Sequence, residues 1–488
     1  MNIFKKKSLC AALAGIGALG VAGAAQAVNL NPDGLGQVLI YPYYTTRNDA
    51  AGNAYNSLLS VVNTTASVKA VKVRFLEGKN SREVLDFNLF LSGNDVWTAA
   101  LTPATGGGTL LTTADRSCTL PQIPTSGVVF RNTLLSADGA GATLDRTTEG
   151  YVEIIEMATY QDSTKTAVNV THSPPGGTPP GCNKVTDAQA TADESGVAGG
   201  LMGGMSLINV NSGSDYTEDA VALDNFATGV SLYFNAGDTR PTLQNAQPQT
   251  SVVIADGGLV FNSDWSIGTT PGANSADPVS AVLMHDTVLN EFVLDTITHS
   301  GTDWVVTMPT KRFYVSNGTG TPSRLFQQNF NKTAGSCDDV LINIFDREEQ
   351  TTSTPIDFSP LPAAGTNSLC WEANVVTFQN SNVLGSANSA NIPTGFQNGW
   401  LDLSFFPSTV TGDVHTLPNG NTTFVDPTVT PPFVSAAGPA TYFGLPVVGF
   451  AVQSFTNGAI TVNGVNTLSN YGGNFIHKGT RVVGFPAP

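Results

Sequence analysis

The charged residues that could act together chemically lie mostly in one segment, SVKAVKVRFLEGKNSREVLDFNLFLSGNDVW, residues 67–97. The members of interest are Arg74, Glu77, Arg82, Glu83, Asp86 and Asp95. Two carboxyl groups that converge in a pocket, one of them with a raised pKa, can perform acid–base chemistry. Only 12% of the residues in the chain are charged, so this concentration is the first place to look for a site.

The apolar pattern of the same segment favours a structural role for these charges. Val71, Val73 and Phe75 alternate with polar residues, which is the period of a strand with one apolar and one wet face. The run Leu85–Leu91 repeats the alternation, and a third run starts at Val96. We therefore expect three strands of an antiparallel meander, with the charged side chains facing solvent and forming no acid–base site.

No other segment offers a known catalytic pattern. The chain contains no G-x-S-x-G, H-E-x-x-H or P-loop motif, and no G-x-G-x-x-G motif after the apolar run Leu9–Ala25. The histidines are scattered, at His172, His285, His299, His415 and His477. His285 and Asp286 begin the densest local group of ionisable residues, but no nucleophile accompanies them. The sequence therefore predicts no catalytic residue.

Calcium is the one cofactor that the sequence suggests. The segment NVNSGSDYTED, residues 209–219, places oxygen-bearing side chains around Gly213. The candidate ligands are Asn209, Asn211, Asp215 and Asp219, with Glu218 beside them. Oxygen ligands about a glycine turn suit a hard cation. The segment lacks the leading Asp and the terminal Glu of an EF-hand loop, so we favour the alternative of an ordinary polar turn.

The chain opens with a secretory signal. Lys5–Lys7 form a basic region, Leu9–Ala25 is a run of small and apolar residues, and Ala25-Gln26-Ala27 is a cleavage triplet. These three parts in this order predict a signal peptide over residues 1–27. No later stretch is apolar for about 18 residues, so we expect no membrane-spanning helix in the mature chain.

The cysteine pattern agrees with export. Of five cysteines, Cys10 lies in the signal, and the others are Cys118, Cys182, Cys337 and Cys370. An even number in an exported chain predicts two disulfides. Three pairings are possible, and we favour Cys118–Cys182 with Cys337–Cys370. A metal site is the alternative, although no C-x-x-C pair and no adjacent histidine supports it.

Short, turn-punctuated strands continue to the end of the chain. They are predicted at Gln37–Tyr41, Leu58–Asn63, Gly150–Tyr160, Gly199–Val210, Val230–Phe234, Ser251–Ile254, Leu259–Phe261, Asp303–Met308, Arg312–Val315, Val340–Phe345, Asn374–Phe378, Trp400–Phe406, Val447–Phe455 and Ala459–Val462, with a tight turn at Asn317-Gly318. Only Asp219–Phe226 and Ala281–Glu291 suggest short helices. This pattern predicts an all-β protein, an antiparallel β-sandwich of Ig-like architecture.

A Gly/Pro-rich region divides the strands. Residues 161–200 contain Pro174-Pro175-Gly176-Gly177 and few apolar runs, which predicts a loop region. We expect two packed β domains with long loops, an N-terminal sandwich at 28–160 and a C-terminal β-rich part at 201–488.

Composition restricts the classes of partner. The formal net charge of −16 opposes binding to nucleic acid and docking on anionic lipid. A surface rich in hydroxyl and amide groups suits extracellular β proteins. It also suits lateral assembly, because little like-charge repulsion opposes contact between identical faces.

Several segments together resemble a known group of proteins. They are GLGQVLIYPYYT, NTTASVKAVKVRFLEGKNSREVLDFNLFLSGNDVW, TDWVVTMPTKRFYV and GLPVVGFAVQSF. The set resembles exported proteobacterial proteins described only as hypothetical or cell-surface proteins. The resemblance implies a surface or envelope location in a Gram-negative bacterium, and it implies no activity and no site residues.

These observations predict a secreted envelope or cell-surface protein, located at the surface, outside the cell or in the periplasm. Its role would be structural or adhesive and non-catalytic, and its partners would be copies of itself, other envelope components or surface glycans. One alternative is an outer-membrane β-barrel. Another is a secreted carbohydrate-active or glycan-binding protein, which would need exposed aromatic residues in a groove. We instead expect the tryptophans in the core, at Trp97, Trp265, Trp304, Trp371 and Trp400.

Overall fold

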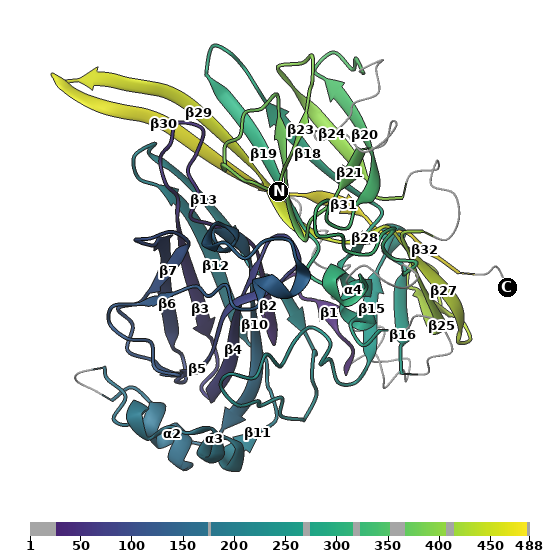
Figure 1. The fold of residues 1–488 in the computed structure, drawn as a ribbon. Coiled ribbons are helices and arrows are strands. Elements are labelled where there is room, and N and C mark those ends of the chain that lie inside the picture. The colour runs from purple at the N-terminus through teal and green to yellow at the C-terminus, as the bar shows by residue number, and fades with distance from the viewer. Residues whose placement is uncertain are drawn as a thin grey trace.

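The structure is a computed structural model, and it describes residues 26–173, 177–266, 274–315, 323–351, 367–406 and 414–485. These residues form mainly strands, in sheets whose neighbours are antiparallel except for one described parallel pair (Figure 1). The prediction of an all-β, sandwich-like fold of antiparallel sheets is confirmed. Most of the predicted signal peptide and the predicted turn at Asn317-Gly318 lie outside the described residues.

Two sheets face each other in the N-terminal half. The first has the order β1 (Asn29–Leu30), β14 (Val221–Asp224), β2 (Val38–Thr45), β10 (Glu149–Tyr160), β4 (Val68–Glu77), β5 (Glu83–Leu91) and β8 (Cys118–Leu120), with β11 (Glu194–Ser195) beside β10. The second has the order β13 (Ser214–Asp219), β12 (Leu201–Asn209), β3 (Asn56–Asn63), β6 (Val96–Pro103), β7 (Thr109–Thr112) and β9 (Val128–Val129).

The alternation in the sequence explains the core between these two sheets. Val73 and Phe75 of β4 are buried in one apolar cluster with Val61 of β3 and Trp97 of β6. Burying such side chains contributes about 1.5–3 kcal/mol each. The ring of Trp97 lies edge-on to Phe87 of β5, with centroids 5.7 Å apart. The apolar faces of the two sheets therefore hold the sandwich together.

The connectivity differs from the predicted meander. β4 pairs with β5, but β6 pairs with β3 in the opposite sheet. The turn after Leu91 thus carries the chain across the sandwich, and Asp95 caps this turn by accepting a hydrogen bond from the backbone N–H of Ser92. Local alternation defines each strand, but it does not define which strand will be its neighbour.

The N-terminal sheets also extend further along the sequence than expected. β12, β13 and β14 complete them, so the change to C-terminal sheets comes after Asp224 and not at residue 201. The segment Asp219–Phe226, predicted as a helix, contains β14. The segment Val230–Phe234, predicted as a strand, is irregular.

The region 161–200 is more ordered than the predicted loop. It contains α2 (Lys165–Val170) and α3 (Asp187–Asp193), and the side chains of Val170 and Ala190 pack with Met157 of β10. The predicted disulfide Cys118–Cys182 is present and attaches this region to β8.

Four further sheets form the C-terminal half. One has the order β15 (Thr250–Ile254), β16 (Val260–Asp264), β25 (Thr416–Asp426), β27 (Gly438–Phe443) and β32 (Val483–Gly484), with β26 (Phe433–Val434) beside β25. A second has the order β21 (Asn367–Leu369), β20 (Asp338–Asp346), β24 (Asn398–Ser404), β18 (Thr287–Val293) and β31 (Lys478–Thr480). A third has the order β23 (Ser389–Ile392), β22 (Ala373–Phe378), β19 (Ser300–Thr307), β29 (Val448–Val462) and β30 (Val465–Ile476), and the fourth is the pair β17 (Met284–His285) and β28 (Leu445–Pro446).

Short helices complete the described chain. They are α4 (Asp277–Leu283) and the 3₁₀ helices η2 (Leu135–Asp138), η3 (Leu144–Thr147), η4 (Cys182–Lys184), η5 (Asp256–Gly258) and η6 (Lys311–Phe313). The predicted helix at Ala281–Glu291 is therefore only the end of α4 followed by β17 and β18. The predicted strand at Arg312–Val315 overlaps η6 instead. No helix in the described ranges is both long enough and apolar enough to cross a membrane.

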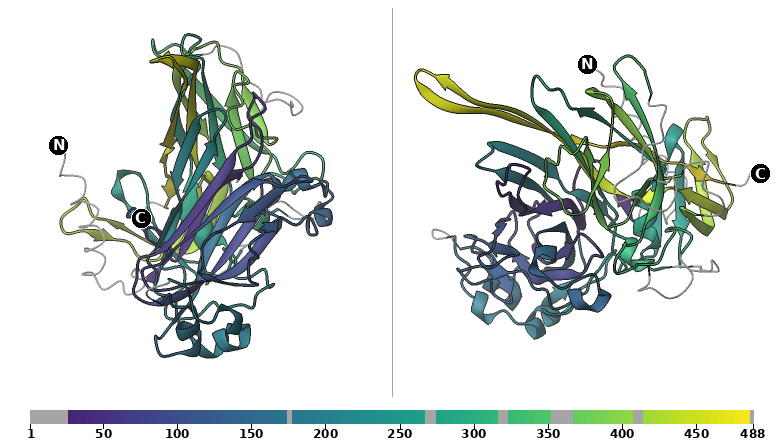
Figure 2. Two further views of the ribbon diagram at one scale, coloured as in Figure 1. Left: turned by 90° about the vertical axis from the view of Figure 1, so that its left-hand side faces the viewer. Right: turned by 45° about the horizontal axis from the view of Figure 1, so that its top comes forward.

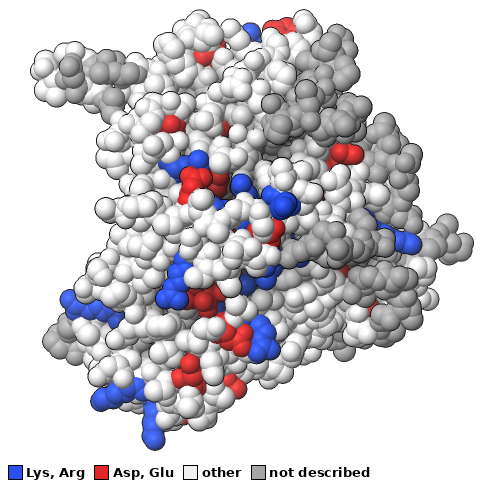
Figure 3. Space-filling model, viewed as in Figure 1, with Lys and Arg blue, Asp and Glu red and all other residues white. Residues whose placement is uncertain are grey.

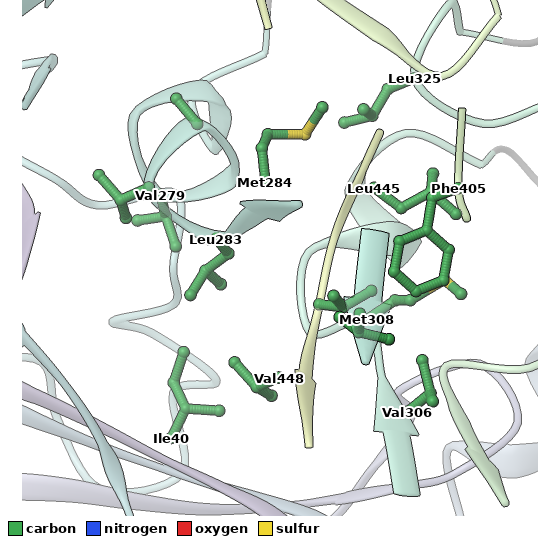
Figure 4. Close-up of a cluster of buried hydrophobic side chains, with 14 of the residues drawn as sticks. Ile40, Val279, Leu283, Met284, Val306, Met308, Leu325, Phe405, Leu445 and Val448 are labelled. Atoms are coloured by element: carbon green, nitrogen blue, oxygen red, sulfur yellow. The ribbon is translucent and has the colours of Figure 1, made fainter. Parts of the chain in front are cut away.

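The two halves share a core. Ile40 of β2 belongs to the same buried cluster as Val279 and Leu283 of α4 and Val448 of β29, and Figure 4 shows these side chains around one apolar space. The second predicted disulfide, Cys337–Cys370, is also present. The halves therefore contact each other through apolar side chains and are not joined by a linker alone.

Candidate interaction surface

The charged residues of segment 67–97 do not face solvent, and the expectation of a wet sheet face is wrong for them. Arg74, Glu77 and Glu83 are buried, while Arg82, Asp86 and Asp95 are half-buried. The prediction assumed that the polar face of this sheet is exposed to solvent. In the structure, later parts of the chain cover that face.

Two segments make this cover. The irregular chain after β14 lies over β4 and β5, where Lys72 Nζ donates a hydrogen bond to the carbonyl of Asp238 at 2.9 Å and Asn88 donates one to the carbonyl of Phe234 at 3.0 Å. The turn after β19 covers β10, where the Tyr151 hydroxyl donates a hydrogen bond to the carbonyl of Pro309. Polar side chains of β4, β5 and β10 are therefore enclosed between chain segments.

Ion pairs compensate for this burial. Arg74 lies between Glu83, at 2.9 Å, and Glu153. Burial raises the pKa of both carboxyl groups, and the guanidinium opposes that rise. Arg146 is likewise bonded to Glu77 and Asp138. Each of these carboxylates contacts a cation, so their charges are compensated and the cluster does not present a free acid and base.

One carboxyl group extends this polar cluster into the C-terminal half. Glu372 Oε2 accepts hydrogen bonds from the Ser81 hydroxyl at 2.9 Å and from the backbone N–H of Arg312. Burial raises the pKa of Glu372 to about 8. These contacts join the turn between β4 and β5 to the segment after β19, so buried hydrogen bonds also connect the two halves.

The predicted calcium ligands do not converge. Asn209 is buried and donates hydrogen bonds to Asp49 and to the carbonyl of Asn53. Asp215 and Asp219 are exposed on the opposite face of β13, and four residues of a strand separate them by about 13 Å. Asn211 lies in the exposed turn between β12 and β13. In the described parts of the chain, no three His, Cys, Asp or Glu residues form a group that could hold a metal ion.

A projecting hairpin is the most distinctive surface feature. β29 and β30 pair from Phe450–Ile476 to Val462–Val465, and their far ends extend beyond the body of the molecule (Figure 1; right-hand view of Figure 2). We call residues 456–470 the arm. Asn463 and Gly464 close it with positive φ angles of 52° and 81°, as a tight two-residue turn requires.

The arm has an unusual surface for an outer strand. From Pro427 to His477 the chain contains no Asp, Glu, Lys or Arg, and the described part of the arm is free of charge in Figure 3. Val462 and Val465 are 49% and 64% exposed, and β30 is the last strand of its sheet. Outer strands are normally protected by charges or proline, so an unprotected one is a site for contact with another chain.

A groove lies on the outer face of the second N-terminal sheet. It has a volume of about 880 Å³ and crosses β13, β12, β3, β6 and β7. Leu58 and Met202 supply its apolar floor, and both are about 40% exposed. Ser60 and Thr98 supply hydroxyl groups, and among its lining residues only Asp33 and Asp219 are charged. Its surface chemistry therefore resembles that of the arm.

Gly203 of β12 leaves room on the inner side of the sheet that carries this groove. A Cβ atom at Gly203 would lie 2.2 Å from the carbonyl oxygen of Ser60 and 2.3 Å from the hydroxyl of Tyr41. The absence of a side chain at Gly203 leaves space for the Tyr41 hydroxyl, which donates a hydrogen bond to the Ser60 carbonyl at 2.8 Å.

The tryptophans do not line the groove. Trp97 and Trp304 are fully buried, as predicted, and Trp265 and Trp371 are half-buried. Trp400 differs from the prediction because it is exposed on β24, where it stacks on Phe345 with ring centroids 4.6 Å apart. The groove therefore lacks the aromatic platform that usually holds a sugar ring.

The chain matches no model of a protein family, and neither the curated proteins nor the solved structures include a match to it. Functional inference consequently rests on the geometry of the arm and the groove. Sequence reasoning missed both. The signals were Asn463-Gly464 between two valines and the long charge-free stretch around it, which together predict an uninterrupted, unprotected hairpin.

Proposed function

We propose that this protein is a non-catalytic envelope or cell-surface protein with a structural role, and that it acts by associating with copies of itself. The observation that carries the proposal is the arm, a projecting hairpin without charged residues. Its partner in this proposal is the groove of a second copy.

The dimensions of the two surfaces support this pairing. Seven residues of β29, Thr456–Val462, span about 20 Å at about 3.3 Å per residue. The groove crosses five strands, which lie about 4.8 Å apart, so it is about 19 Å across. The valines at the tip of the arm would contact Leu58 and Met202, and little like-charge repulsion would oppose the contact.

Two features support export. The predicted signal peptide directs the chain out of the cytoplasm, and the disulfides Cys118–Cys182 and Cys337–Cys370 are compatible with an oxidising compartment. A protein of this kind would meet many identical copies at the envelope, where weak reciprocal contacts can add up.

The direct test removes the arm. Phe455 pairs with Tyr471, so replacing residues 456–470 with Asn-Gly leaves a shorter hairpin closed by a favourable turn. Sedimentation velocity of the mature protein should show concentration-dependent association that this variant loses. A wild-type protein that stays monomeric over the whole soluble range would refute the proposal.

Mixing two defective variants tests the pairing itself. Leu58→Lys with Met202→Lys places charges in the groove but keeps the arm, and the shortened variant keeps the groove but lacks the arm. Each should be monomeric alone, and together they should form a one-to-one complex. Val96→Lys, on the same sheet face but outside the lining of the groove, is the matched control.

A further inference from the structure

A second feature lies at the junction of the two halves and is independent of self-association. It is a partly enclosed cavity of about 160 Å³. Leu30 of β1 and Val221 of β14 come from the N-terminal half, whereas Leu283, Val306 and Val448, labelled in Figure 4, come from the C-terminal half. Ligand sites occur preferentially at such junctions.

The lining is apolar except for two histidines and Arg481. Arg481 is the only formally charged residue in the lining. An apolar cavity of about 150 Å³ can hold a molecule the size of benzene. The shape and chemistry therefore suit a compact apolar body that carries one negative charge.

Hydrogen bonds fix both imidazoles as neutral rings. His285 Nδ1 lies 3.0 Å from the carbonyl of Leu283, to which it donates, so its Nε2 accepts from Arg481 Nη2 at 3.1 Å. His477 Nε2 donates to the carbonyl of Val305, and its Nδ1 accepts from Asn290. Burial lowers the pKa of His285 to about 3 and that of His477 to about 4.

The guanidinium of Arg481 is hydrogen-bonded to a neutral side chain, the imidazole of His285. In the part of the chain that the structure describes, its side chain forms no ion pair, and its hydrogen bonds go to His285 Nε2. The nearby carboxylate of Asp256 instead accepts a hydrogen bond from the backbone N–H of Arg481. Burial lowers the pKa of Arg481 to about 10, although Asp256 opposes this. The guanidinium of Arg481 thus lacks the carboxylate partner that its planar array of N–H donors is suited to bind.

We infer that this cavity binds a small monocarboxylate whose apolar body is the size of a benzene ring or a short alkyl chain. The carboxylate would accept hydrogen bonds from Arg481, and the body would contact Leu283, Val306 and Val448. His285 is a positioning residue, because its Nε2 accepts the hydrogen bonds that orient the guanidinium of Arg481.

Calorimetric titration of the folded protein with benzoate and with hexanoate tests this inference. Binding of either probe, with benzyl alcohol at least about tenfold weaker than benzoate, supports it, because a hydrogen bond to a charged group is worth about that much. Failure of both carboxylates to bind, or equal binding of benzyl alcohol and benzoate, would overturn it.

The variant Arg481→Met locates the site. It should weaken benzoate binding by at least about tenfold and leave benzyl alcohol binding unchanged, which also shows that the cavity is intact. Arg347→Met, at an exposed position on the turn after β20, is the matched control and should bind benzoate like the wild type. Unchanged benzoate binding by Arg481→Met would place any binding elsewhere and overturn the inference.

Discussion

Asn474 of β30 donates a hydrogen bond to Glu218 of β13 at 2.6 Å. This contact joins the base of the arm-bearing hairpin to the edge of the sheet that forms the groove. Asn474 also donates to the carbonyl of Thr217, and Asn470 donates to the carbonyl of Ser212. The arm therefore projects from a base that is fixed to the N-terminal sandwich.

Burial of Glu218, which the hydrogen bond from Asn474 only partly offsets, makes stability depend on pH. Burial raises the pKa of Glu218 to about 7, above the value of an exposed glutamate, so folding takes up a proton between these two values. Stability contributed by Glu218 is complete below about pH 4.5 and is lost as pH rises toward 7. Glu218→Gln should remove this dependence and raise the free energy of unfolding at pH 8 by about 1–2 kcal/mol. Urea denaturation at pH 5 and pH 8 measures it, and an equal pH slope in both proteins would contradict the prediction.

The buried ion pairs predict a large effect of one substitution. Arg74→Met leaves Glu83 and Glu153 without their shared cation and should lower the free energy of unfolding by about 3–5 kcal/mol. The loss should be smaller at pH 5 than at pH 8, because protonation neutralises the orphaned carboxyl groups. Chemical denaturation measures both values. Adding Glu153→Gln should recover part of the loss, and a double variant no more stable than Arg74→Met would count against the pairing.

A single lysine on the arm should weaken association. Val465→Lys places a charge near the tip, where it would be desolvated in the contact with a second copy, and we expect the dissociation constant to rise at least about tenfold. Val168→Lys, on α2, alters a similarly exposed valine far from the arm and should associate like the wild type. Sedimentation equilibrium compares the two. Equal weakening by both variants would mean that charge acts in general and not at the arm.

The disulfide Cys118–Cys182 should control the order of the helical region. Cys118→Ser with Cys182→Ser should lower the free energy of unfolding by about 2–4 kcal/mol. It should also expose residues 161–200 to protease before the rest of the chain, because this region would lose its covalent attachment to β8. Limited proteolysis with mass spectrometry identifies the first cuts. Early cutting elsewhere would indicate that packing of Val170 and Ala190 alone holds the region.

Much of the fold followed from local patterns. Alternating apolar residues predicted β4 and β5, short β-prone runs predicted β3 and the start of β6, and cysteine positions predicted both disulfide pairs. These features depend on short-range periodicity or on the number of possible pairings, and both can be counted in the chain itself. The errors at β14 and η6 occurred in short runs, where neighbours in space decide between helix, strand and turn.

The sequence by itself determined that this protein is built of sheets with polar and apolar faces. Only the tertiary structure decided which polar faces of the sheets are exposed to solvent. Arg74 lies on the polar face that alternation assigned to it, yet it is buried because residues distant in the chain bring Glu153 and a covering segment to it. Likewise, Val462 ends the predicted strand Ala459–Val462, yet it is exposed because the hairpin extends past the body. Periodicity reports the side on which a residue lies, and long-range packing decides what covers that side.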